Sequence, residues 1–184
     1  MHFFTKRHPS QPYLTTTTLV ISAIFIALNI IFTHLFAIQT PFIRISLSFL
    51  PIAMFCMLFG PLLGGIVAAI ADVLGCLFFS PGLFFPGFTL SSFAAGMIYG
   101  YFLHNKKITL RRITLASMVV FLAIDLGLNT LWLSILYNKA AQAFLLARFV
   151  KGAALLPLQI AAIYTICKPL LRYKVARNIS LNRL

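Results

Sequence analysis

Apolar stretches of helical length, separated by short polar or Pro-Gly segments, run through the whole chain. They predict six membrane-spanning helices, at about residues 14–36, 47–59, 61–79, 90–103, 113–137 and 144–171. A helix satisfies its own backbone hydrogen bonds in hydrocarbon, so a bundle of such helices is the simplest fold. We therefore expect an all-α integral membrane protein, a six-transmembrane-helix bundle that forms a single domain over residues 1–184.

The breaks between the stretches carry turn-forming residues. Residues 39–44 separate the first two spans and are expected to form a loop. Gly60 and Pro61 separate the second span from the third, because proline suits the first turn of a new helix. Residues 80–89 contain two Pro-Gly pairs with phenylalanines between them, which predicts a structured turn ahead of the fourth span.

Composition excludes a soluble fold. Hydrophobic residues make up 61% of the chain, charged residues 9%, and the mean hydropathy is +0.99, whereas soluble domains carry about 25% charged residues. The formal net charge of +13 does not indicate a nucleic-acid binder, because the basic residues flank apolar spans instead of forming a water-facing patch. The three cysteines are widely spaced within apolar runs and are expected to be buried thiols.

The basic residues also predict the orientation. With six spans, both termini lie on the same side of the membrane. That side receives eleven of the fifteen lysines and arginines: Lys6, Arg7, Lys106, Lys107, Arg111, Arg112, Lys168, Arg172, Lys174, Arg177 and Arg183. The positive-inside rule then places both termini in the cytoplasm of a multi-pass protein.

The remaining four lysines and arginines fall near the opposite side, namely Arg44, Lys139, Arg148 and Lys151, and three of them suggest a site. Arg44 lies in the first outer loop, and Arg148 and Lys151 lie three residues apart near the outer end of the sixth span, so they share a helix face. No acidic loop residue is present to pair with them. They form either an anion-binding site or a set of side chains that reach out to lipid phosphates.

The only two acidic residues, Asp72 and Asp125, lie inside apolar spans. Each either accepts hydrogen bonds from a ligand's N–H groups or makes a polar contact between helices. Asn129 follows Asp125 by four residues and Trp132 follows Asn129 by three, so these side chains form one polar stripe with an indole beside it.

Aromatic residues gather in the segment before the fourth span. Phe84, Phe85 and Phe88 are placed either to stack on a flat heterocycle or to sit at the membrane interface, as many aromatic residues do. Together with the nearby cations and the carboxylates within the spans, they suit a ligand with a planar head and an anionic tail. No ATP-binding loop and no convincing nucleophile–base motif occurs in the sequence.

Several sequence blocks resemble the substrate-binding S components of energy-coupling factor (ECF) transporters, and within that family the folate-specific type. The resemblance covers nearly the whole chain. It includes the Ala23–Ala27 pair of the first span and the blocks Arg44–Ile52, Phe59–Pro61, Ala71–Gly75, Phe84–Leu90, Gly96–Gly100, Asn129–Leu133 and Arg148–Lys151, with Pro157.

The resemblance implies a protein of the prokaryotic cell membrane that binds folate at its extracellular end and topples in the membrane to release it inside. It implies a transmembrane coupling subunit, EcfT, and two cytoplasmic ATPases, EcfA and EcfA′, as partners, so ATP is used by those subunits and this chain needs no cofactor. In that family, alanines such as Ala23 and Ala27 dock on the coupling subunit.

Alternative functions remain open at this point. The same scaffold could bind another vitamin or precursor, such as pantothenate or hydroxymethylpyrimidine. A small integral-membrane enzyme or assembly scaffold is an alternative of another class, although an enzyme would need a reactive pair of side chains within reach of each other. We expect a transport subunit without catalysis of its own, and no metal site.

Overall fold

The fold is described by a computed structural model that covers residues 15–35, 38–39, 44–79, 84–137 and 145–181, without the side chains of 38–39, 44–45, 137, 145, 147 and 171–181. The helices of this part of the chain are α1 (Thr16–Ile30), η1 (Ile31–Leu35), α2 (Phe49–Phe59), α3 (Pro61–Phe79), α4 (Pro86–Leu103), α5 (Leu110–Val119), η2 (Val120–Leu128), α6 (Asn129–Tyr137) and α8 (Leu145–Leu181). The segments η1 and η2 have the wider π-helical turn and continue the helices before them.

The predicted all-α membrane class is confirmed. Within the described residues, four helical segments are long and apolar enough to cross a membrane: Thr16–Leu35, Pro61–Phe79, Leu110–Leu136 and Arg148–Leu170. Between them lie the shorter α2, with 11 residues, and α4, with 18. Large apolar side chains such as Leu77, Phe78 and Leu146 are exposed on the outside of the bundle, as lipid contact requires.

Several helix ends differ from the positions that hydropathy predicted. The fourth helix begins at Pro86 instead of residue 90, because proline fits the first turn of a helix, where no backbone N–H is needed. The last helix continues from Leu145 to Leu181 through Pro157 and Pro169, well beyond the apolar stretch. In the segment predicted as a loop, β1 (Ile38–Gln39) pairs antiparallel with β2 (Arg44–Ile45).

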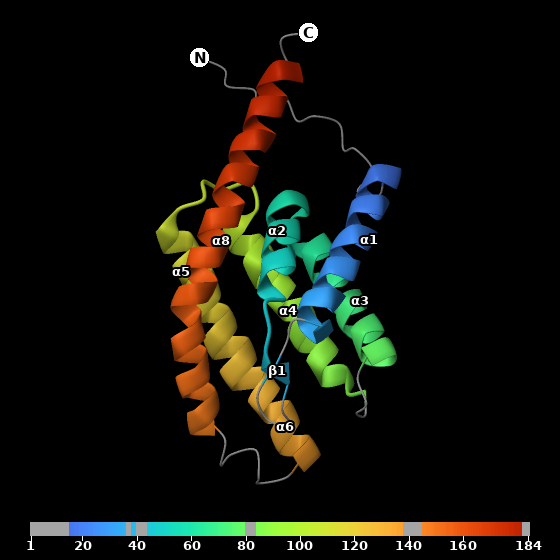
Figure 1. Ribbon diagram of the computed structural model, residues 1–184, viewed down its shortest axis with the longest axis vertical. Helices are drawn as coiled ribbons and strands as arrows, with labels where there is room; N and C mark the ends of the chain where they lie inside the picture. Colours follow the sequence, from blue (N-terminus) through green and yellow to red (C-terminus); the bar gives the residue numbers. More distant parts are fainter. Residues whose placement is uncertain (1–14, 36–37, 40–43, 80–83, 138–144, 182–184) are drawn as a thin grey trace, which may run out of the picture.

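The two ends of the bundle can be told apart in Figure 1. Helix α1 begins and α8 ends at one end, which we call the terminal end. Helix α4 begins, α6 ends and α8 begins at the opposite end, toward which β1 and β2 extend, and which we call the hairpin end.

Glycines allow α3 and α4 to pack backbone against backbone. A Cβ added at Gly96 would lie 2.7 Å from the carbonyl oxygen of Gly64 and 2.8 Å from the Cα of Gly65. Gly100, one turn further along α4, meets the backbone of Pro61 in the same way. Gly64, Gly96 and Gly100 therefore serve the close packing of α3 against α4 inside the bundle.

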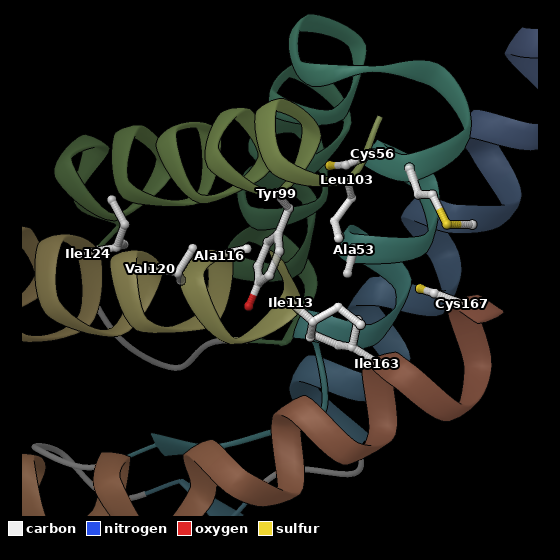
Figure 2. Close-up of a cluster of buried hydrophobic side chains, with 11 residues drawn as sticks. Ala53, Cys56, Tyr99, Leu103, Ile113, Ala116, Val120, Ile124, Ile163 and Cys167 are labelled. Carbon is white, nitrogen blue, oxygen red and sulfur yellow. The ribbon is translucent and has the colours of Figure 1, made fainter. Parts of the chain in front are cut away.

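The buried core lies where α2, α4, α5 and α8 meet (Figure 2). Ala53, Leu103, Ile113 and Ile163 are fully buried there. Tyr99 extends from α4 toward α5, and its hydroxyl is hydrogen-bonded by the side-chain amide of Gln159 on α8. This core fixes α4 against the long α5–η2–α6 helix, which carries much of the candidate site.

Replacing Gly96 by alanine is expected to destabilise the bundle. The added methyl group would force α3 and α4 apart and cost about 1–3 kcal/mol. The melting temperature of the purified protein in detergent should fall by several degrees. Gly127→Ala is the matched control, because its added Cβ would lie at an ordinary 3.4 Å from the carbonyl oxygen of Leu122. Equal melting temperatures for the two variants would show that the α3–α4 contact tolerates a side chain.

Candidate functional site

Three aromatic side chains form a cluster at the hairpin end. The rings of Phe85 and Trp132 are 5.7 Å apart between centroids and inclined at 55°, and those of Phe85 and Phe88 are 6.0 Å apart and nearly perpendicular. Phe85 directly precedes α4, Phe88 lies in its first turns and Trp132 comes from α6. We call these three residues the aromatic cluster. Two segments far apart in sequence thus present aromatic faces at one place.

Two residues that sequence reasoning did not single out hold this cluster. Gly87 is buried on α4, and a Cβ added there would lie 2.6 Å from the Cδ2 atom of Trp132 and also clash with the ring of Phe85. Ser91, four residues later on the same helix face, accepts a hydrogen bond of 3.0 Å from the indole Nε1 of Trp132. The four-residue spacing of two small residues was the only sequence signal for this face.

Charged side chains meet between η2 and α8. Asp125, Arg148 and Lys151 line a hollow of about 30 Å³ together with Phe121, Leu126 and Gly152. Both cations lie close enough to the Asp125 carboxylate to interact with its charge. We call Asp125, Arg148 and Lys151 the charged hollow. The predicted proximity of Arg148 and Lys151 is therefore present, with Asp125 opposite them.

Arg148 is held in place by two oxygens of the neighbouring helix. Its Nη1 donates to the hydroxyl of Thr130 and its Nη2 to the backbone carbonyl of Asp125, both at 3.2 Å. Thr130 is buried and was not among the residues predicted from the sequence. A guanidinium held in this way has further N–H donors for an anion.

Asn129 connects the two groups. It lies one turn after Asp125 and one turn before Trp132 on the same helix. Its Nδ2 donates to Asp125 Oδ1 at 3.3 Å, whereas its buried Oδ1 has no hydrogen-bond partner among the described residues. A buried acceptor of this kind is costly to leave unpaired, so it is suited to an incoming N–H group.

Asp72 lies apart from the aromatic cluster. Its Oδ2 accepts a hydrogen bond of 2.9 Å from Thr89, between α3 and α4. Gly87 and Ser91 lie on the face of α4 that meets Trp132. Thr89 is two residues from each of them, so it lies on nearly the opposite face of the helix, about 200° around. Ligand binding by Asp72 stays a prediction, and its hydrogen bond to Thr89 fits the alternative role of a contact between helices.

The remaining predicted residues are placed as follows. Phe84 is exposed just before α4. Arg44 belongs to β2, where its backbone pairs with that of Gln39, and its side chain lies outside the described part. Ala23 and Ala27 lie on an exposed face of α1, beside exposed Val20 and Ile24. Their spacing and exposure leave a flat strip of α1 open to another helix.

A groove of about 350 Å³, larger than the charged hollow, runs between α5–η2 and α8. It is lined by Met118, Phe121, Leu122, Phe149, Ala153, Leu156, Pro157 and Ile160. Because this lining has no charged side chain, it cannot recognise an anionic group. The candidate groups for recognising a ring and an anion are therefore the aromatic cluster and the charged hollow, which share the helix η2–α6 through Trp132 and Asp125.

Comparison with known proteins shows the family of the chain. The protein-family model for the S component of ECF-type riboflavin transporters matches residues 13–172. The folate transporter FolT of Clostridium novyi is 43% identical over 162 residues, which cover 88% of this chain and 94% of that protein. FolT of Leuconostoc mesenteroides is 32% identical over 160 residues, which cover 83% of this chain and 85% of that protein.

A solved structure has the same fold. The crystal structure of a FolT bound with folic acid superposes with a TM-score of 0.81 and 38% sequence identity, and the match covers 84% of this chain and 95% of that one. Helical architecture, sequence and length thus agree over most of the chain. The protein is a multi-pass membrane protein that belongs to the S-component family of energy-coupling factor transporters, a transport family and not an enzyme family.

Proposed function

We propose that this chain captures folate for an ECF importer. The observation that carries the proposal is that one continuous helix, η2–α6, bears both Asp125 of the charged hollow and Trp132 of the aromatic cluster. Folate has a flat pterin at one end and a glutamate with two carboxylates at the other, so it needs both kinds of surface. The FolT relatives and the FolT structure with folic acid support the same ligand.

Each end of folate has matching groups in the described structure. The pterin would stack on the aromatic cluster, and its N–H groups would find an acceptor in Asn129 Oδ1. The glutamate carboxylates would bind Arg148 and Lys151, and charge-assisted hydrogen bonds of this kind are the stronger ones. Arg44, Phe84 and Asp72 remain predicted contributors to the same site.

Other ligands of the family fit less well. Riboflavin, which the matched family model names, has a flat ring system but no carboxylate for Arg148 and Lys151. Pantothenate has a carboxylate but no ring for Phe85 and Trp132, and a hydroxymethylpyrimidine has a ring but no acid. Folate alone among these uses both groups of side chains.

Family membership and the exposed face of α1 suggest which proteins this chain binds. We propose that Ala23 and Ala27 dock on the coupling subunit EcfT, because the small side chains leave α1 open to close helix contact. EcfA and EcfA′ would supply the ATP hydrolysis, so this chain would need no cofactor. The hairpin end would face the outside and both termini the cytoplasm, and the bundle would topple to deliver folate inward.

Removing either cation of the charged hollow should weaken folate binding selectively. Arg148→Ala or Lys151→Ala is expected to lower affinity for folate by about 10- to 100-fold, because a desolvated carboxylate loses its charged partner. Affinity for a neutral pterin should change little. Isothermal titration of both ligands against each variant measures the difference.

Lys168→Ala serves as the control, since this lysine lies over the ring of Tyr164 in the C-terminal half of α8, away from the charged hollow near the start of that helix. It should bind folate as the unaltered chain does. An equal loss of folate and pterin binding in the Arg148 and Lys151 variants would contradict the role of these residues in holding the acidic tail.

Bulky residues on the exposed strip of α1 should separate binding from transport. Ala23→Trp and Ala27→Trp are expected to leave folate affinity unchanged but to abolish uptake when the chain is produced with its coupling subunits. Radiolabelled folate uptake by cells and titration of the purified protein report the two activities.

Ala161→Trp is the matched control, because Ala161 is exposed on α8, on the other side of the bundle from α1 (Figure 1). Transport by this variant should continue. Loss of ligand binding in the Ala23 or Ala27 variants would mean that this strip belongs to the internal packing of the chain.

A further inference from the structure

Trp132 is anchored to α4 at two points. The ring-fusion carbon Cδ2 of its indole lies over Gly87, where any side chain would collide with it. Its Nε1 donates to Ser91 Oγ at 3.0 Å, and Ser91 is only 2% exposed. An indole N–H is a donor only, and a buried one needs an acceptor, so the hydroxyl of Ser91 fixes the orientation of the ring as well as its position.

Phe85 is held differently. It lies against Trp132 and Phe88 through ring contacts alone, because a phenyl ring has no hydrogen-bonding group. Its backbone is extended, with φ −123° and ψ 117°, at the N-cap of α4, where the helix has not yet begun. A change of its side-chain rotamer therefore breaks no hydrogen bond of that side chain.

The distance between the two rings bears directly on binding. A flat heterocycle stacked between two aromatic rings needs about 3.5 Å on each side, or about 7 Å in all. The centroids of Phe85 and Trp132 are 5.7 Å apart and the planes are inclined at 55°, so no third ring fits between them. A ligand ring can therefore enter between Phe85 and Trp132 only if one of the two rings moves.

We infer that Ser91 is a positioning residue that keeps Trp132 as the fixed wall of a heterocycle site between the two rings, while Phe85 is the ring that moves aside. This inference rests on the proposed folate binding. The hydrogen bond makes Trp132 the more costly ring to displace, whereas Phe85 gives up ring contacts that a heterocycle replaces. Ser91 thus acts on affinity through Trp132 without touching the ligand.

The chain offers a direct probe, because Trp132 is its only tryptophan. In Ser91→Ala, the indole N–H loses its acceptor, so the ring should reorient. We expect a shifted emission maximum and stronger quenching by acrylamide in the purified protein without added ligand. Folate affinity should fall about tenfold, through faster dissociation. Ser117→Ala, at another fully buried serine outside the site, should leave emission and affinity unchanged.

A double-mutant cycle separates positioning from general packing. Trp132→Phe keeps a ring but has no N–H, so adding Ser91→Ala to it should cause no further loss of folate affinity, as measured by isothermal titration. Phe85→Ala should speed folate association in stopped-flow measurements, because no ring has to be displaced. Additive losses in the cycle would overturn the role of Ser91, and an unchanged or slower association rate would overturn that of Phe85.

Failure of the proposed function is distinguishable from failure of this inference. If the unaltered chain binds no folate, the proposed ligand is wrong, while the emission of Ser91→Ala still reports whether Ser91 orients the indole. If the unaltered chain binds folate and Ser91→Ala matches it in both emission and affinity, Ser91 only fills space between α4 and α6.

Discussion

A charged side chain within a membrane is stable only where protein groups replace the water around it. Arg148, on α8, finds such groups in the helix beside it. Its two hydrogen bonds, to the hydroxyl of Thr130 and the carbonyl of Asp125, connect α8 to the junction of η2 and α6. The π-helical turn of η2 ends at this junction, and such turns are frequent at functional sites. The placement of the charged hollow, and of Asn129 and Trp132 after it, depends on this connection.

The residues proposed for ligand binding and those proposed for docking lie on different parts of the bundle. The residues that contact the aromatic cluster and the charged hollow come from α4, η2, α6 and α8, whereas α1 packs on α2 and α3 and exposes Ala23 and Ala27. The backbone contact of Gly96 with Gly64 joins the two parts. This separation would allow the proposed binding residues to hold a ligand while the exposed face of α1 contacts a partner.

Hydropathy was sufficient to predict the class of fold, because hydrocarbon imposes the same requirement on every span. The proximity of Arg148 to Lys151 also followed from their three-residue spacing. The partners of these residues could not be predicted. Ser91 and Trp132 are 41 residues apart and Arg148 and Thr130 are 18 apart, so each pair meets only through helix packing. The hydrogen bond of Asp72 to Thr89 and the π-helical turn of η2 likewise have no signature in the local sequence.

The central claim is that the hairpin end recognises one molecule with a flat head and an acidic tail. Native mass spectrometry tests it most directly, on the chain produced without coupling subunits in folate-replete cells and released gently from detergent. We expect a complex of one chain with one folate, whose mass identifies the bound form. A chain that carries a flavin or another ligand without carboxylates would contradict it.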